Sequence, residues 1–499
     1  MSSELIVLIV LVLFFLMLAI EMPVAFALGF SGAIGVIMLH SFDVASSVLA
    51  NVPYESTAKF SLVVIPLYIL LGAMATQARI PERIYGLINR VVGRFRGGMA
   101  IATIGACGGF AAVSGSSVAT AATLGKISVR QMIRHGYRPE LATGIVAIGA
   151  TLGILIPPSI ILIMYSIMSG ESIEALFSAG IIPGILSAIA YIITALVVLR
   201  RQSPVPAEDL VRFAGLDEAV AVGAGRADPM LRQQAEGGGT AVLSKTATSG
   251  GSRPSGGSTA SSSGSIGSVS LFSEWRSVFW LGAILVAVLM GIFTGTTTLT
   301  ESAGVASVVA LVAVVAEHFK GGVRTVVGKV RDALAETAAV TSMIFAIVIG
   351  AGIFAYFLVS ARVPNNVSRF FADVDLPPIL IVILILVMII PLGMFLESMA
   401  VVVIVVPIVY PTIIELGFDG IWFAILLVKL VEVGLLTPPV GMNCFVISGA
   451  TGIPLERVFK GVAPFLVCEV VIVAVLIIFP DIVLWLPGVV ESMGSSTGP

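Results

Sequence analysis

The sequence is poor in charge and in the residues that most enzymes use as bases or metal ligands. Only 11% of its 499 residues are charged, and only three are histidine. No Walker A sequence and no H-E-x-x-H zinc motif occurs in it. These absences favour a protein that is neither an enzyme nor an ATPase. The net charge of −2 indicates no particular partner, and we do not expect a chain of this composition to bind nucleic acid.

Cysteine is equally scarce. Cys107, Cys444 and Cys468 all lie in apolar stretches, and their separations match no metal-binding spacing. A free cysteine in such surroundings behaves as a small hydrophobic residue. We therefore expect neither a disulfide framework nor a thiolate metal centre.

Apolar residues, in contrast, are abundant: 58% of the chain is hydrophobic, and the mean hydropathy is +1.09. Apolar stretches of about 20 residues, the length that crosses the hydrocarbon core of a bilayer, recur from end to end. The sequence predicts an all-α polytopic membrane protein embedded in a lipid bilayer. The predicted spans are residues 5–20, 23–39, 62–78, 141–168, 173–199, 278–297, 303–316, 337–358, 421–448 and 465–486.

Two of these spans contain matching breaks. One reads GILIPP at 153–158 and the other GLLTPP at 434–439. Proline lacks a backbone N–H and clashes with the preceding turn, so each break frees carbonyl oxygens inside the hydrocarbon. Such carbonyls are tolerated only beside protein or water, where they can hold a cation. Broken spans at corresponding places in two halves indicate the binding site of a secondary transporter.

Each broken span follows an apolar segment, at 99–125 and at 379–410, that we predict to be a re-entrant helical hairpin. Basic loops set the orientation, because cytoplasmic loops carry Lys and Arg. The threading that fits them puts both termini outside, the first hairpin entering from the cytoplasm and the second from outside. Residues 1–200 and 273–499 then form inverted repeats of an elevator-type transporter.

Residues 201–272 separate the two predicted repeats. They are rich in Gly, Ser and Ala and have too few apolar residues for a core of their own. We interpret them as a flexible cytoplasmic linker. A regulatory docking segment is the alternative.

The hairpin tips carry the candidate chemistry. The first tip, SGSSVAT at 114–120, offers hydroxyl oxygens suited to Na⁺, although small residues also let membrane helices pack closely. The second tip, GMFLESM at 393–399, contains Glu397. A carboxylate inside a membrane segment indicates a functional site. It either contacts ion or substrate, or caps the helix that follows.

Lys429 and Glu432 precede the second break and lie three residues apart, on one face of a helix. They form either an internal ion pair, which neutralises both charges in a low dielectric, or a site in which Glu432 lies beside the transport path. Asn443, just past the break, could supply a further oxygen.

Taken together, these motifs resemble the large membrane subunit of tripartite ATP-independent periplasmic (TRAP) transporters, the DctM-like family. The matching pieces cover both halves of the chain except the linker. They are MPVAFALG at 22–29, PLYIL at 66–70, RGG at 96–98, SGS at 114–116, GILIPP at 153–158, GIIPG at 180–184, GMFLE at 393–397 and TPPVGMN at 437–443. The stretch VATAAT at 118–123 departs from the Asp-bearing pattern of many relatives, and the linker is longer than expected.

The resemblance implies a Na⁺-coupled permease of the cytoplasmic (inner) membrane that moves by an elevator mechanism and needs no cofactor besides Na⁺. It also implies three partners: a separate small membrane subunit of four spans, a periplasmic binding protein, and the organic acid that this protein delivers. The implied Na⁺ ligands are Ser114, Ser116, Gly153, Ile156 and Pro158, with Gly393, Gly434, Thr437 and Pro439 as their counterparts by pseudo-symmetry. The candidate substrate residues between the two tips are Ser117, Thr120, Glu397, Ser398 and Asn443.

Two other interpretations stay open. One is an autonomous ion-coupled dicarboxylate carrier of the elevator type, which needs no binding protein. The other is a membrane scaffold without a transport site.

Overall fold

The computed structural model describes residues 2–92, 95, 97–214, 271–293, 297–372 and 376–496, and every structural statement below refers to these residues. All their regular elements are helices. In the first half they are α1 (Ser3–Ala19), α2 (Val24–Leu39), α3 (Phe42–Thr57), α4 (Val64–Gln77), α5 (Ile80–Val92), α6 (Gly98–Ser114), α7 (Ser117–Arg134), α8 (Pro139–Leu155), α9 (Ile160–Ser169), α10 (Ile173–Arg201) and α11 (Ala207–Ala214). In the second half they are α14 (Leu271–Phe293), α15 (Leu299–His318), α16 (Val323–Ser360), α17 (Val363–Ala372), α18 (Pro378–Phe395), α19 (Ser398–Glu415), α20 (Gly420–Leu436), α21 (Met442–Thr451), α22 (Leu455–Ile478) and α23 (Asp481–Ser496).

Seven helices of the described part are long and apolar enough to cross a membrane, or eight if the bent pair α8 and α9 counts as one span. Helices α1 and α2, which were predicted as spans, are apolar but one to two residues shorter than this criterion requires. The all-helical, polytopic prediction is confirmed.

Helix boundaries in the two halves recur at a nearly constant separation along the chain. Helices α7 and α19 begin at Ser117 and Ser398, 281 residues apart, and α8 and α20 end 281 residues apart. Gly136 and Gly417, the left-handed glycines that follow α7 and α19, have the same separation. The order hairpin, broken helix, further helix therefore occurs twice, in α6–α10 and in α18–α22.

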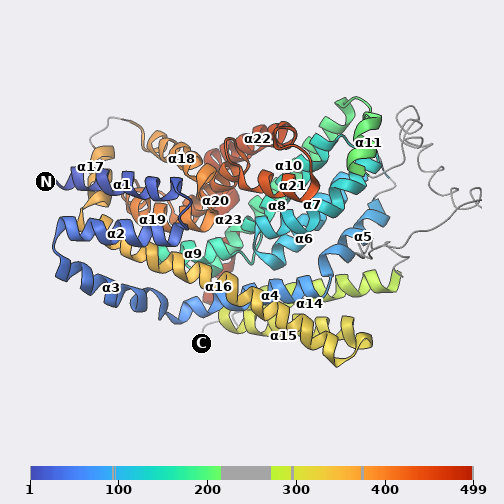
Figure 1. Ribbon diagram of the computed structural model, residues 1–499, viewed down its shortest axis with the longest axis horizontal. Helices are drawn as coiled ribbons and strands as arrows, with labels where there is room; N and C mark the ends of the chain where they lie inside the picture. Colours follow the sequence, from blue (N-terminus) through green and yellow to red (C-terminus); the bar gives the residue numbers. More distant parts are fainter. Residues whose placement is uncertain are drawn as a thin grey trace, which may run out of the picture.

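Contacts between the two copies are reciprocal. Helix α8 packs on α22 and α20 on α10, while α7 packs on α21 and α19 on α9. Reciprocal contacts are what an approximate two-fold relation between the copies produces. We call α6–α10 with α18–α22 the core. Helices α1–α5 and α14–α17 form the framework, in which α16 packs along α2 and α15 along α4 (Figure 1).

Glycine allows two backbones of the core to touch where α8 crosses α22. A Cβ atom on Gly461 would lie 1.8 Å from the carbonyl oxygen of Glu140, and one on Gly144 would lie 2.2 Å from the carbonyl oxygen of Gly461. Without side chains at this crossing, the two repeats approach more closely than ordinary helices can.

Two elements differ from the sequence predictions. Helix α3 was not foreseen, because its mixture of Ser, Asn and Glu with apolar residues has no membrane-spanning run. The predicted span 465–486 is two helices, since Pro480 follows the end of α22 and α23 starts afresh at Asp481. Each difference arises from a boundary that hydropathy alone does not mark.

The start of the predicted linker also differs. Residue 201 closes α10, and residues 207–214 form α11, which packs on α7. Leu210 of α11 is fully buried, and Asp209 accepts two hydrogen bonds of 2.8 Å from Arg457. The first residues after α10 are therefore part of the core surface. The rest of the predicted linker, 215–270, lies outside the described residues.

The Gly461 crossing predicts a steric effect. Replacing Gly461 with Ala forces a methyl group into the Glu140 carbonyl, so we expect a loss of about 1–3 kcal/mol in the free energy of unfolding. Gly449→Ala in α21 is the control, because its Cβ meets open space and only helix propensity changes. Thermal unfolding of both variants in detergent measures the difference. Equal midpoints for the two variants would contradict the close approach.

Candidate functional site

The first break separates α8 from α9, whose axes differ by 41°. Pro157 has no N–H to donate to the carbonyl oxygen of Gly153, its partner in a continuous helix. The carbonyl of Ile154, freed in the same way by Pro158, instead accepts a hydrogen bond from the Ser159 hydroxyl. The Ile154 carbonyl therefore has a hydrogen-bond donor inside the break itself. The Gly153 carbonyl has lost its helical donor and is able to bind a cation.

The second break lies between α20 and α21 and differs in detail. The N–H of Thr437 donates to the Gly434 carbonyl at 3.1 Å, and the Thr437 hydroxyl donates to the Val433 carbonyl at 2.5 Å. Pro438 and Pro439 are exposed, whereas the prolines of the first break are buried. Both Pro-Pro bonds are cis. The two breaks thus share a Pro-Pro sequence after a helix end, but only the prolines of the second break are exposed at the protein surface.

The first hairpin tip lies against the first break. Gly115 has a φ of +61°, and a Cβ there would lie 3.2 Å from the carbonyl oxygen of Pro158. The neighbouring Ser116 caps α7, its hydroxyl accepting a hydrogen bond from the N–H of Ala119 at 3.3 Å. The structure thus brings the predicted ligands Ser116 and Pro158 close together. The side chain of Ser114 lies outside the described residues.

At the second tip the contact runs between glycines. A Cβ on Gly434 would lie 2.6 Å from the Cα of Gly393, so α18 and α20 touch backbone to backbone. Glycine is required here by packing, whether or not either residue binds an ion. Glu397 occupies the N-cap position of α19, at the positive end of that helix.

Candidate substrate residues from opposite repeats also meet. The Ser117 hydroxyl donates to Oδ1 of Asn443 at 3.5 Å, and both side chains are buried. Nδ2 of Asn443 has no hydrogen-bond partner in the described part of the chain. The Thr120 hydroxyl donates to the Ser116 carbonyl at 2.8 Å. Among the described hydrogen bonds, none joins Glu397 or Ser398 to Ser117 or Asn443.

A buried charge cluster lies behind the second break. Lys429 Nζ is 3.3 Å from Glu432 Oε2 and 2.8 Å from Glu469 Oε1, and all three side chains are at most 1% exposed. The ammonium also donates to the hydroxyls of Ser187 and Tyr191, each at 3.1 Å. Lys429 therefore ties α20 to α10 and α22 and fixes the helix that leads into the break.

The predicted Lys429–Glu432 ion pair is present, but the sequence interpretation missed the three partners from other helices. One signal was available. Glu469 is the only carboxylate in the predicted span 465–486 apart from Asp481 near its end, and an acidic residue inside such a span needs a partner. Ser187 and Tyr191 gave no signal, since their spacing along α10 is that of ordinary packing residues.

The helical bundle, its paired hairpins and its broken helices define a membrane transporter. A family model described as the DctM component of a tripartite ATP-independent periplasmic transporter matches residues 11–482. The chain belongs to this family and is a multi-pass membrane protein.

Two of three individual relatives agree with this chain in length as well as in sequence. The C4-dicarboxylate TRAP transporter large permease protein DctM of Pseudomonas aeruginosa is 31% identical, over 92% of this chain and 93% of its own. The sialic acid TRAP transporter large permease protein SiaM of Vibrio cholerae is 27% identical, over 93% and 95%. The isethionate TRAP transporter permease protein DctMQ of Oleidesulfovibrio alaskensis is 26% identical, over 95% of this chain and 65% of its own.

Among solved structures, the Alcanivorax borkumensis YdaH transporter has a similar fold. It matches with a TM-score of 0.55 and 12% sequence identity, over 88% of this chain and 89% of its own. At this identity the likeness concerns the fold alone.

The Lys429 cluster predicts a large effect on stability. Lys429→Met leaves two buried carboxylates without a cation, and breaking a buried ion pair in this way costs about 3–5 kcal/mol. Lys460→Met is the matched control, because Lys460 forms a solvent-exposed pair with Glu456 on α22, and exposed pairs contribute little to stability. Thermal unfolding of the purified variants tests this. A Lys429→Met protein as stable as the control would contradict the assignment.

Proposed function

We propose that the chain is the large permease subunit of a TRAP transporter that takes up an organic acid by Na⁺ symport. The observation that carries this proposal is the repeated arrangement of a hairpin beside a Pro-Pro break, in a chain of the DctM family. A membrane protein has no other common reason to free carbonyl oxygens twice, at corresponding places, beside small hydroxylated residues.

Na⁺ is a hard cation that prefers oxygen ligands, and the first site offers them. The Gly153 carbonyl has lost its helical donor to Pro157, and the Ser116 hydroxyl lies on the tip that touches Pro158. With Ser114 and Ile156 these residues form the proposed first Na⁺ site. Gly393, Gly434, Thr437 and Pro439 form the second, which rests on the 281-residue correspondence between the repeats.

Ion binding at the breaks is proposed to be coupled to substrate binding by the two hairpin tips. Each tip closes over the substrate once its site is filled, and only the fully loaded or the empty core then crosses the membrane. Ser117, Thr120, Glu397, Ser398 and Asn443 lie on the helices that follow the tips or breaks. They remain the candidate substrate residues.

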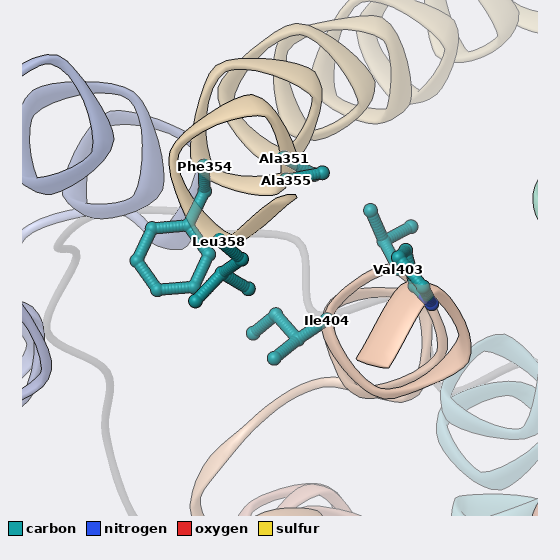
Figure 2. A pocket seen from close by; sticks show the side chains of 7 residues that line it. Ala351, Phe354, Ala355, Leu358, Val403 and Ile404 are labelled. Atoms are coloured by element: carbon teal, nitrogen blue, oxygen red, sulfur yellow. The ribbon is translucent and has the colours of Figure 1, made fainter. Parts of the chain in front are cut away.

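The core is proposed to move past the framework as an elevator. Where framework helix α16 faces core helix α19, the side chains between the two helices are hydrocarbon alone: Ala351, Phe354, Ala355, Leu358, Val403, Ile404 and Pro407 (Figure 2). An apolar lining has no directional bonds to break when one helix shifts against the other. This interface therefore resists sliding less than a hydrogen-bonded one would.

The partners follow from the family. We propose a separate small membrane subunit of four spans and a periplasmic binding protein that delivers the acid, with both termini of this chain on the outer side of the inner membrane. Supporting this, the DctMQ relative is a single permease chain of which this chain covers only 65%.

The proposal is tested in proteoliposomes that hold this chain and its small subunit. Labelled succinate, N-acetylneuraminate and isethionate are offered with an inward Na⁺ gradient, with and without the cognate binding protein. We expect uptake of one solute that requires both the gradient and the binding protein. Uptake without the binding protein would instead indicate an autonomous carrier. No uptake of any solute would contradict the proposal.

The Na⁺ site predicts the effect of one hydroxyl. Ser116→Ala should raise the Na⁺ concentration for half-maximal uptake about tenfold or more, because one ligand to a charged group is lost. Ser116 also caps α7, so the variant loses about 1 kcal/mol of stability as well.

Ser172→Ala is the control for that cap. Ser172 caps α10 in the same way, at 3.2 Å from the Ala175 N–H, but helix α9 separates it from the first break. It should lower stability similarly and leave the Na⁺ dependence unchanged. The same Na⁺ dependence in Ser116→Ala and wild type would remove Ser116 from the site.

A further inference from the structure

Two helices of opposite repeats meet with their N-terminal ends together. Helix α7 starts directly after the first hairpin tip, and α21 starts directly after the second break, and the two pack against each other (Figure 1). Their closest polar side chains are Ser117, the first residue of α7, and Asn443, the second residue of α21. A helix N-terminus carries a partial positive charge, so two such ends meeting create a place that favours an anion.

The backbone amides at these ends precede the first intrahelical hydrogen bonds. In α7 the Thr120 N–H donates to the Ser116 carbonyl, and in α21 the Cys444 N–H donates to the Gly441 carbonyl. The N–H groups of Ser117 and Asn443 come before these bonds and cannot take part in them. Neither helix contains an acidic residue that could neutralise its positive end.

Asn443 provides an independent observation. Its side chain is fully buried, and Nδ2 has no partner in the described part of the chain. An amide donor left unpaired in the interior costs about 1–3 kcal/mol, so such groups are usually satisfied by a partner or a ligand. The Ser117 hydroxyl donates to Oδ1, so the hydrogen bond that joins the two helices leaves the Nδ2 donor unused.

The inverted counterpart of this place lacks the same groups. There α19 meets α9, and Ser398 occupies the position of Ser117, 281 residues on. The position that corresponds to Asn443 at the same separation holds Leu162, whose side chain has no donor. The N-cap position of α19 is occupied by an acidic residue, Glu397. The anion-favouring arrangement therefore exists on one side of the pseudo-symmetric site only.

We propose that the α7–α21 junction binds the carboxylate of the transported solute, with Asn443 Nδ2 and the open N–H groups of the two helices as donors. Ser117 is a positioning residue that orients the Asn443 amide. No cationic side chain of α7 or α21 lies at this end, so the carboxylate is held by dipoles and neutral donors. The inference rests on the proposed function and assigns one end of its substrate to one pair of helices.

The test uses the reconstituted permease with its small subunit and a fixed excess of binding protein. The half-saturating concentration is measured for the solute that the wild type transports among succinate and N-acetylneuraminate. Asn443→Asp keeps the size of the side chain but sets a negative charge against the carboxylate. We expect a rise of about 100-fold or more in Asn443→Asp. In Asn443→Leu we expect about 10- to 100-fold, the effect of losing a hydrogen bond to a charged group.

Thermal unfolding distinguishes binding from packing. An acidic residue in the first turn of α21 suits the helix dipole, so Asn443→Asp should unfold within a few degrees of the wild type. Ser117→Ala should raise the half-saturating concentration less than either Asn443 variant. Asn51→Asp, an exposed change of the same chemistry on α3, should alter neither quantity.

Wild-type half-saturation in Asn443→Asp would overturn the inference. A parallel loss of thermal stability and uptake in both Asn443 variants would assign this residue to packing and overturn it as well. Transport of isethionate but of neither carboxylate would overturn the inference and leave the proposed function standing, whereas no transport of any of the three solutes under a Na⁺ gradient would contradict both.

Discussion

The rest of the structure depends on one constraint: a backbone carbonyl inside hydrocarbon must find a partner. Each Pro-Pro break removes two helical N–H donors. The groups that donate to the nearby carbonyls differ between the two breaks. At the first break the Ser159 hydroxyl donates to the Ile154 carbonyl, and the hairpin tip lies against the Pro158 carbonyl. At the second break Thr437 donates to the carbonyls of Gly434 and Val433 in the preceding turn. The Gly153 carbonyl of the first break, which has lost its helical donor, is the one that a cation can use.

Such breaks would weaken the bundle unless the helices around them were held firmly. The buried Lys429 cluster joins α20 to α10 and α22 through three hydrogen bonds, and the glycine contacts at Gly461 and Gly434 bring the backbones of the repeats and of the second hairpin into contact. The ion pairs of Lys429 and the close glycine contacts thus stabilise the core, so its stability does not depend on contacts made by the hairpin tips. The framework contact at α16 and α19, by comparison, is hydrocarbon alone.

Much of this could be predicted from sequence, because proline, glycine and apolar run length act locally. The two breaks, both hairpins and the Lys429–Glu432 pair all follow from short patterns. Contacts between distant segments could not be predicted in the same way. Glu469 reaching Lys429, Ser117 reaching Asn443, and α11 docking through Asp209 join residues tens to hundreds of positions apart. No local rule specifies which of several polar residues pair across helices.

The central claim is that the core moves as one body against the framework when its ion sites fill. It is tested most directly by pulsed EPR distances between spin labels at Val327 on α16 and Lys460 on α22, both exposed, after replacement of the native cysteines. A second pair at Glu174 and Lys460 reports on the core alone. The account predicts that Na⁺ and solute shift the first distance distribution and leave the second unchanged. An unchanged first distance in every condition, or equal changes in both, would contradict it.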